Sequence, residues 1–162
     1  MLLIPVVGLF TMPLTLVHAD ETAELAQALK DIRVTLQDGL KASEREGKPI
    51  SAKFEIEHDA LQLSIYTVKG NDFVEAVADP KTGAIAKSEK ITDADDLKAA
   101  AVQKASMAKA TVPLLAATDK AVKANAGFRA VSVYPKAEAG HVVAEVTLLQ
   151  GTTSKKVTEK LD

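Results

Sequence analysis

The sequence predicts an α+β fold with two units, each a helix packed on a three- or four-stranded antiparallel meander, joined by an extra helix. Two observations predict it. Apolar and polar residues alternate with a period of two through residues 53–91, and more loosely through residues 128–161. Such alternation is typical of strands with one buried face. Each stretch follows a segment whose apolar residues recur at helical spacing.

Composition narrows the class of protein. The chain has 162 residues, a net charge of −2 and 47% hydrophobic residues, which is typical of a folded globular protein. No basic patch would attract a phosphate backbone, so we expect no nucleic-acid partner. Aromatic residues make up only 4% of the chain and tryptophan is absent, which argues against a stacking platform for bases or sugars.

The first nineteen residues read as a secretory signal peptide that is removed. Residues 2–17 are apolar, interrupted by Pro5 and Pro13, and the small residue Ala19 precedes the acidic Asp20. A lysine or arginine near Met1 is missing, which is atypical of such signals. The alternatives are a buried N-terminal helix or an uncleaved membrane anchor. Since the chain has no cysteine, a lipoprotein signal and disulfides are both excluded, and we expect a bacterial periplasmic or secreted protein.

A long helix is predicted to open the mature chain at Asp20. Its apolar residues form one stripe along one face: Leu25, Leu29, Ile32, Leu36 and Leu40. Gly47 and Pro49 then predict its end, because proline cannot continue a helix. A helix with a single apolar stripe needs a partner surface, and we expect the following strands to supply it.

The first meander should contain four strands with turns between them. The strands are predicted at residues 53–57, 61–66, 73–78 and 84–90. Turns are expected at His58-Asp59, at residues 69–72 and at residues 79–83, where Asp79, Pro80 and Gly83 have the chemistry of a tight turn. The fourth strand should be an edge strand, because its charged residues discourage further pairing.

The sequence does not decide which face of the third strand is buried. Both Phe73 with Val77 and the set Val74, Ala76 and Ala78 are apolar enough to face the core.

The second half begins with helices. Asp93, Asp95 and Asp96 form an N-terminal capping cluster for a helix over residues 93–109, which should connect the two units. A second helix is expected over residues 112–126, where Pro113 is tolerated near the start. Strands should follow at residues 128–134, 142–149 and 155–161, separated by a loose hairpin over residues 135–141 and a turn over residues 150–153.

The order of helix, glycine, strand, hairpin, strand, glycine turn and strand therefore occurs twice, as an internal repeat. Leu61-Leu63-Ile65 registers on Val142-Ala144-Val146, and Gly70 registers on Gly151. Asp79 registers on Asp162 if the second turn is two residues longer. The expected divisions are a signal peptide (1–19), a first domain (20–91), a connecting helix (92–110) and a second domain without the last strand (111–162).

This layout resembles the PepSY domain, a module of exported bacterial proteins and of the propeptides of thermolysin-like metallopeptidases. The resemblance is carried by Gly47-Lys48-Pro49-Ile50, by the strand pair Phe54–Ile56 and Leu61–Ile65, and by Phe73–Ala78 running into Asp79-Pro80-Lys81-Thr82-Gly83. It is good over residues 24–91 and weaker over residues 112–162. It implies a helix on an antiparallel sheet, no catalysis, and a role in restraining peptidases or binding partners in the cell envelope. Because no peptidase domain is attached, a propeptide role in cis does not apply.

Candidate reactive sites are few. His58, flanked by Glu57 and Asp59, could form half of a divalent-metal site, and His141 lies in the equivalent hairpin of the second half. Consecutive strand residues point to alternate faces, however, so a solvated hairpin is the better interpretation. The three aspartates at residues 93–96 are explained by helix capping and by the helix dipole.

Other chemistry is also missing from the sequence. There is no cysteine, no serine lies in a nucleophile-elbow context, and Gly70 and Gly83 are turn glycines without phosphate-loop spacing. The lysines at residues 87–90 and 155–156 read as solubilising strand ends. We therefore predict no catalytic residues, no metal and no cofactor.

The sequence thus favours a non-catalytic exported binding module that contacts, and modulates or inhibits, a cell-envelope peptidase. The alternative is a periplasmic protein that responds to a small molecule or a metal through a pocket between helix and sheet. An enzyme is the least favoured reading. The expected partner is a protein of the cell envelope, with no nucleic acid and no membrane contact after signal removal.

Overall fold

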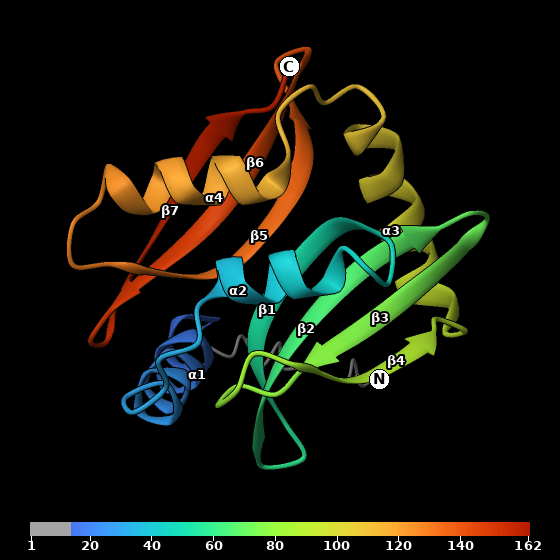
Figure 1. Cartoon of the computed structure of the whole chain (residues 1–162). Coiled ribbons are helices and arrows are strands. Elements are labelled where there is room, and N and C mark those ends of the chain that lie inside the picture. Colours follow the sequence, from blue (N-terminus) through green and yellow to red (C-terminus); the bar gives the residue numbers. More distant parts are fainter. Residues whose placement is uncertain (1–13) are drawn as a thin grey trace, which may run out of the picture.

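The computed structural model describes residues 14–162 and confirms an α+β fold. Seven antiparallel strands form one sheet in the order β4-β3-β2-β1-β5-β6-β7 (Figure 1). The helices are α1 (Leu14–Ala28), α2 (Leu36–Ser43), α3 (Ala94–Met107) and α4 (Leu114–Lys123). The strands are β1 (Lys48–Glu57), β2 (Ala60–Lys69), β3 (Asp72–Ala78), β4 (Ile85–Lys90), β5 (Arg129–Glu138), β6 (His141–Gln150) and β7 (Thr153–Lys160). The two halves of the chain therefore share one sheet, which β1 and β5 join at its centre.

The first helix differs from its prediction. The expected continuous helix is wrong, because α1 ends at Ala28 and α2 begins at Leu36. Thr35 starts α2 with a capping box: its hydroxyl accepts from the backbone N–H of Asp38, and the Asp38 carboxylate accepts from the backbone N–H of Thr35. A capping residue at Thr35 indicates the start of a new helix. The apolar stripe continues across this position and therefore suggested one continuous helix.

The apolar stripe itself was predicted correctly. Leu29, Leu36 and Leu40 are buried in the core, and Leu25 and Ile32 pack against it. The stripe therefore identifies core residues on both sides of the break without requiring one helix. Burial of such side chains contributes about 1.5–3 kcal/mol each to the stability of the fold.

The first meander follows its prediction closely. His58 and Asp59 both have positive φ, as a two-residue hairpin turn requires. In the turn after β3, the Asp79 carboxylate accepts from the backbone N–H groups of Lys81 and Thr82, and Gly83 supplies a φ of +75°. Strand β4 lies at the edge of the sheet, as expected. Strand β1, however, begins at Lys48, well before the predicted start.

The pairing of β3 with β2 shows which face of β3 is buried. Val74, Ala76 and Ala78 pair with Thr67, Ile65 and Leu63 of β2, and these three β2 residues are buried. Directly paired residues share a face, so this set of β3 faces the core. Phe73 and Val77 lie on the opposite face.

The hairpin between β5 and β6 corrects another prediction. Instead of a loose loop over residues 135–141, β5 continues through Pro135 to Glu138, and the turn consists of Ala139 and Gly140 alone. Strand β1 pairs with β5 only at Ser132 and Val133. Since that ladder has already ended, the missing N–H of Pro135 costs no bond to β1, and proline is tolerated there.

The strand pairings of the two halves correspond in detail. The β1–β2 pairing shifts register between Pro49 and Ser51, and the β5–β6 pairing shifts register between Ala130 and Ser132. The turns after β2 and β6 are both two residues long. The second turn is therefore not longer, and the predicted match of Asp79 to Asp162 is wrong. Leu63 pairs with Ala78 as Ala144 pairs with Glu159, so Asp79 corresponds to Lys160.

The helices divide between the two faces of the sheet. Helix α2 packs on β1, β2 and β3, and α4 packs on β5, β6 and β7, both in front of the strands in Figure 1. Helix α3 contacts β1 and β5 through residues such as Ser51, whose side chain alternates with the core residue Ala52. Helix α3 therefore lies on the second face, which we call the polar face. It crosses this face where the two halves meet.

The predicted signal peptide lies largely outside the described residues. Its expected end, after Ala19, falls within the bounds of α1. None of the helices formed by residues 14–162 has the length and apolar character needed to cross a bilayer.

Candidate functional site

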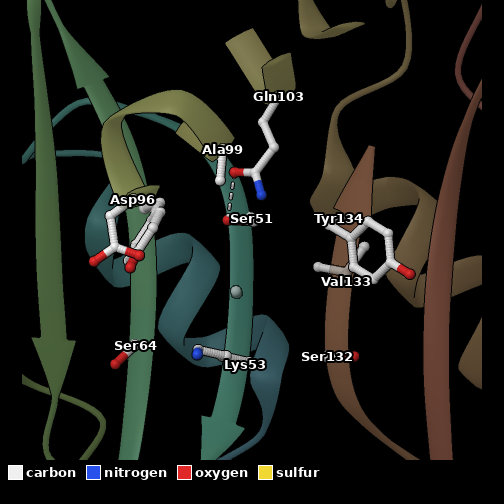
Figure 2. Close-up of a pocket in the computed structure, with 11 residues that line it drawn as sticks. Ser51, Lys53, Ser64, Asp96, Ala99, Gln103, Ser132, Val133 and Tyr134 are labelled. Carbon is white, nitrogen blue, oxygen red and sulfur yellow. Dashed lines mark hydrogen bonds between the residues drawn. The ribbon is translucent and has the colours of Figure 1, made fainter. Parts of the chain in front are cut away.

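A pocket of about 310 Å³ lies on the polar face, at the junction between β1 and β5 and beneath α3 (Figure 2). The strands reach it from both halves of the sheet, and α3 contributes one wall. Its lining residues are Ser51, Ala52, Lys53, Ser64, Tyr66, Asp96, Ala99, Gln103, Ser132, Val133 and Tyr134. We call it the junction pocket.

The β1–β5 pairing explains why a pocket forms here. Only two residue pairs join the strands, Ala52 with Val133 and Lys53 with Ser132. Other neighbouring strands of the sheet pair over five to nine positions. Because the ladder is so short, β1 and β5 separate on either side of it. The space between the two separated strands is not filled by another strand, and this leaves room for a pocket.

Lysine and serine face the pocket from adjacent strands. The Lys53 ammonium lies 2.6 Å from the Glu55 carboxylate, and its side chain is 51% exposed. Ser132 stands directly opposite Lys53 in the ladder. Opposed residues of an antiparallel pair have Cβ atoms about 5 Å apart. The two side chains then diverge: in Figure 2 the Lys53 ammonium extends from β1 toward β2, and Ser132 lies on β5 on the other side.

An aspartate approaches from the helix. Asp96 lies in the first turn of α3 (Figure 2). Its carboxylate accepts a hydrogen bond from the phenol of Tyr66 in β2. Burial raises the pKa of Tyr66, and its hydrogen bond to the Asp96 carboxylate raises it further. The phenol stays protonated at all physiological pH values and donates to the carboxylate. This hydrogen bond holds the Asp96 carboxylate in place at the pocket wall.

Capping of α3 is performed by a different aspartate. The Asp93 carboxylate accepts from the backbone N–H groups of Asp95 and Asp96 at 2.9 and 3.1 Å. Asp93 is thus the capping residue, and Asp95 and Asp96 lie in the first turn, where the helix dipole favours a negative charge, as expected from the sequence. The Asp96 side chain is free of the capping role and lines the junction pocket.

Ser51 and Gln103 tie α3 to the sheet. The Ser51 hydroxyl donates to the Gln103 side-chain oxygen over 2.8 Å, as Figure 2 shows. The bond joins the middle of α3 to β1 at the upper end of the pocket. It fixes the separation between helix and strand, and with it the space available to a ligand.

A second polar cluster lies on the same face in the other half. The buried carboxylate of Glu145 in β6 accepts hydrogen bonds from Tyr134, from Lys136 at 2.7 Å and from Lys156 at 2.9 Å. Hydrogen bonds from Lys136, then from Tyr134 and Lys156, lower the pKa of Glu145 to about 2. All four groups are satisfied by one another, so this cluster is a structural support for Tyr134 at the pocket edge.

Glu75 in β3 has the opposite environment. Burial on the polar face raises its pKa, against a lowering by a hydrogen bond from Ser64, and the nearby Glu55 and Glu57 carboxylates raise it further. The carboxylate has no lysine partner comparable to those of Glu145.

The candidate metal residues are not brought together. His58 is 92% exposed in its turn and lies 3.9 Å from the Glu57 carboxylate, whereas His141 pairs with Asp162 at 3.1 Å in a different hairpin. Within residues 14–162, no group of three histidine, aspartate or glutamate side chains is placed to hold a metal ion.

The remaining candidates have structural roles. Gly70 and Gly83 occupy turns with positive φ. Lys87 pairs with Glu89 on the edge strand β4. Lys155 lies over the ring of Phe128, with its ammonium 4.1 Å from the centroid. Only Lys156, through Glu145, belongs to a polar cluster on the same face as the pocket.

Sequence reasoning missed the junction pocket because its residues are scattered over β1, β2, α3 and β5. Tyr66 and Tyr134 alternate with buried residues of β2 and β5, and this alternation gives no information about whether the two tyrosines line the same pocket. One signal was available: in both halves a serine precedes the centre of the first strand at an equivalent position, Ser51 and Ser132.

Comparison with known proteins gives little further guidance. No family model matches the chain, and no curated protein sequence matches it. One solved structure matches, the crystal structure of a candidate lipoprotein from Clostridium difficile 630. It has 15% sequence identity and a TM-score of 0.41, over 83% of this chain and 91% of that one. At this TM-score the match carries no argument about family or function.

Proposed function

We propose that this chain is an exported, non-catalytic binding module that contacts a protein of the cell envelope through the polar face of its sheet. The apolar leader at residues 2–17 supports export to the bacterial periplasm or the exterior. The resemblance to PepSY domains supports a peptidase as the partner, which the module would restrain or modulate.

The observation that carries this proposal is the polar face itself. Core residues and helices α2 and α4 occupy one face of the sheet. On the other face, α3 contacts β1 and β5 and reaches Tyr66 of β2 and Phe73 of β3. The strands there present hydrogen-bonding and charged side chains: Lys53, Glu55, Gln62, Tyr134, Lys136 and Lys156. An interface needs such complementary polar groups around a concave centre, and the junction pocket supplies the concavity.

The chemistry favours binding over catalysis. The cysteine nucleophile is absent from the sequence, and no histidine is among the residues that line the pocket. Of the pocket hydroxyls, Ser51 donates to an amide oxygen and Ser64 bonds the Glu75 carboxylate. Asp96, the carboxylate in the pocket, is held by a neutral phenol. These arrangements hold polar groups still, which suits recognition.

The test is an inhibition and binding assay with the chain from Asp20 onward. We expect it to slow cleavage by one or more secreted metallo- or cysteine peptidases and to bind that peptidase on a sensor surface. Replacing Lys136 and Lys156 by glutamine on the polar face should weaken binding about tenfold or more. The matched control replaces the exposed Lys41 of α2 and Lys123 of α4 by glutamine on the helical side.

Either of two results would contradict the proposal. Equal losses for both double variants would move the interface away from the polar face. Failure to bind or inhibit any peptidase of the panel would remove the peptidase as partner. Thermal unfolding of each variant checks that the fold is kept.

A further inference from the structure

The junction pocket holds charges of opposite sign on different walls. The Lys53 ammonium comes from β1 and the Asp96 carboxylate comes from α3 (Figure 2). The Tyr66 phenol bonds the aspartate. We propose that this pocket binds a small zwitterion, an amino acid or a dipeptide, whose carboxylate meets Lys53 and whose ammonium meets Asp96. This inference does not depend on the identity of the proposed protein partner.

The carboxylate end is provided by the β1–β5 ladder. An ammonium has three donors, so Lys53 can keep its bond to Glu55 and donate to a second carboxylate. The Lys53 ammonium extends from β1 toward β2, away from Ser132 on β5, so Lys53 is the donor at this end (Figure 2). Charge-assisted hydrogen bonds from an ammonium to a carboxylate are stronger than those between neutral groups. The half-exposed Lys53 side chain also shows that this end of the pocket reaches solvent.

The ammonium end is provided by α3. The Tyr66 phenol occupies one acceptor site of the Asp96 carboxylate and leaves its other lone pairs available. Capping of α3 is done by Asp93, so the Asp96 side chain is not consumed by the helix. A carboxylate held in place by a neutral donor loses little freedom when a cation arrives, which favours binding.

The space between the two ends fits a ligand of this size. The pocket volume of about 310 Å³ lies at the small end of the range for ligand sites, which begins at roughly 300 Å³. Of the apolar residues at the pocket, Ala99 of α3 is exposed and can contact a short ligand side chain, whereas the side chains of Ala52 and Val133 are buried in the core. The bond from Ser51 to Gln103 fixes α3 at the distance that sets this volume.

The test is calorimetric or NMR titration of the chain from Asp20 onward with free amino acids and with dialanine as the simplest dipeptide. We expect saturable binding of one or more of these zwitterions below about 10 mM. The acetylated and amidated form of the same ligand has neither charge, and we expect it to bind about tenfold more weakly or worse.

Two variants test which residue binds the carboxylate of the ligand and which binds its ammonium. Lys53→Met should weaken the zwitterion about tenfold and should leave the affinity for its amidated form unchanged. Asp96→Asn should weaken the zwitterion by a similar factor and should leave the affinity for its acetylated form unchanged.

Matched controls are available on the same molecule. Lys87→Met removes a lysine with the same spacing to a glutamate, Lys87 to Glu89, on β4 away from the pocket. Asp95→Asn changes the neighbouring aspartate in the first turn of α3. Both controls should bind like the unmodified chain.

The proposal is overturned if no zwitterion of the panel binds, if the doubly blocked ligand binds equally well, or if the pocket variants behave like their controls. These outcomes are separable from failure of the proposed function, because the peptidase assay uses Lys136 and Lys156, which do not line the pocket. A chain that binds a peptidase and no zwitterion would refute the pocket proposal alone.

Discussion

The guanidinium carbon of Arg129 lies 5.4 Å from the ring centroid of Phe54, so a cation in β5 stacks on an aromatic ring in β1 across the centre of the sheet. The same guanidinium donates to the backbone oxygens of Leu29, Ile32 and Val34, at 2.8–3.2 Å. These carbonyls belong to the end of α1 and to the segment that leads into α2. Arg129 therefore supplies a charged donor to carbonyls at the break between the two helices, of which Leu29 also accepts from the backbone N–H of Ile32.

Replacing Arg129 by methionine should lower the free energy of unfolding by about 2–4 kcal/mol, because three carbonyls of the break lose a charged donor. Urea denaturation measures this. Arg129→Lys should recover only part of the loss, since one ammonium cannot reproduce the planar guanidinium fork. The exposed Arg45, which bonds only the nearby Ala42 carbonyl, is the control, and Arg45→Met should cost less than about 0.5 kcal/mol. Equal effects at both positions would show that Arg129 does not hold the break.

The carboxylate of Glu145 makes stability depend on acid pH. Its pKa falls from 4.5 to about 2 on folding, so the folded state binds this proton less tightly than the unfolded state. The stabilisation is complete above about pH 4.5 and is lost as the pH falls toward 2. Since Lys136 and Lys156 are partly solvated, we expect a contribution of about 1–2 kcal/mol.

Glu145→Gln should therefore be less stable than the unmodified chain at neutral pH, and the difference should shrink steadily below about pH 4.5. Denaturation at a series of pH values provides the measurement. The matched control is Glu138→Gln, which removes only an exposed partner of Lys136 at 3.7 Å. A difference between Glu145→Gln and the unmodified chain that stays constant with pH would contradict the assignment.

Glu75 should show the reverse behaviour. Its pKa is raised on folding, so its ionisation opposes folding: the cost is absent below about pH 4.5 and grows as the pH rises through the folded pKa. Glu75→Gln should accordingly stabilise the protein at neutral pH by up to about 1 kcal/mol and have no effect in acid. Thermal unfolding at neutral and acid pH measures both values. The exposed Glu44 is a suitable control, and a loss of stability in Glu75→Gln at neutral pH would refute this account.

Gly39 in α2 marks a close approach of helix to sheet. A Cβ at this position would lie 2.7 Å from a terminal methyl carbon of Leu63 in β2. Gly39→Ala should destabilise the protein by about 1–3 kcal/mol, although alanine is favoured over glycine in a helix by about 1 kcal/mol. Combining it with Leu63→Val, which makes room, should cost less than the sum of the two single changes. Additive losses in chemical denaturation would show that the contact is not limiting.

Local patterns in the sequence determined much of the fold. Alternation identified the strands, the turn at Asp79-Pro80-Lys81-Thr82-Gly83 was correct, and the stripe from Leu25 to Leu40 gave core residues correctly. These features depend on neighbouring residues, whose relative positions are set by backbone geometry. The break between α1 and α2 was not predicted from the sequence, because one of the side chains that stabilise it, Arg129, lies almost a hundred residues away along the chain.

The junction pocket could not be predicted from the sequence either, because it also depends on contacts between segments that are far apart in the chain. Whether two antiparallel meanders share one sheet depends on which edges pair, and the edge strands of both halves carry compatible backbone groups.

By itself, then, the sequence determined the α+β class, the positions of most strands and turns, the buried stripe and the absence of cysteine chemistry, because each follows from residue type and short-range spacing. Only the tertiary structure decided that β1 pairs with β5 over two residue pairs and that Arg129 closes the helix break. It alone decided that Lys53, Asp96 and the two tyrosines line one pocket. Such contacts between distant segments are selected by the packing of the whole chain, and local spacing does not encode them.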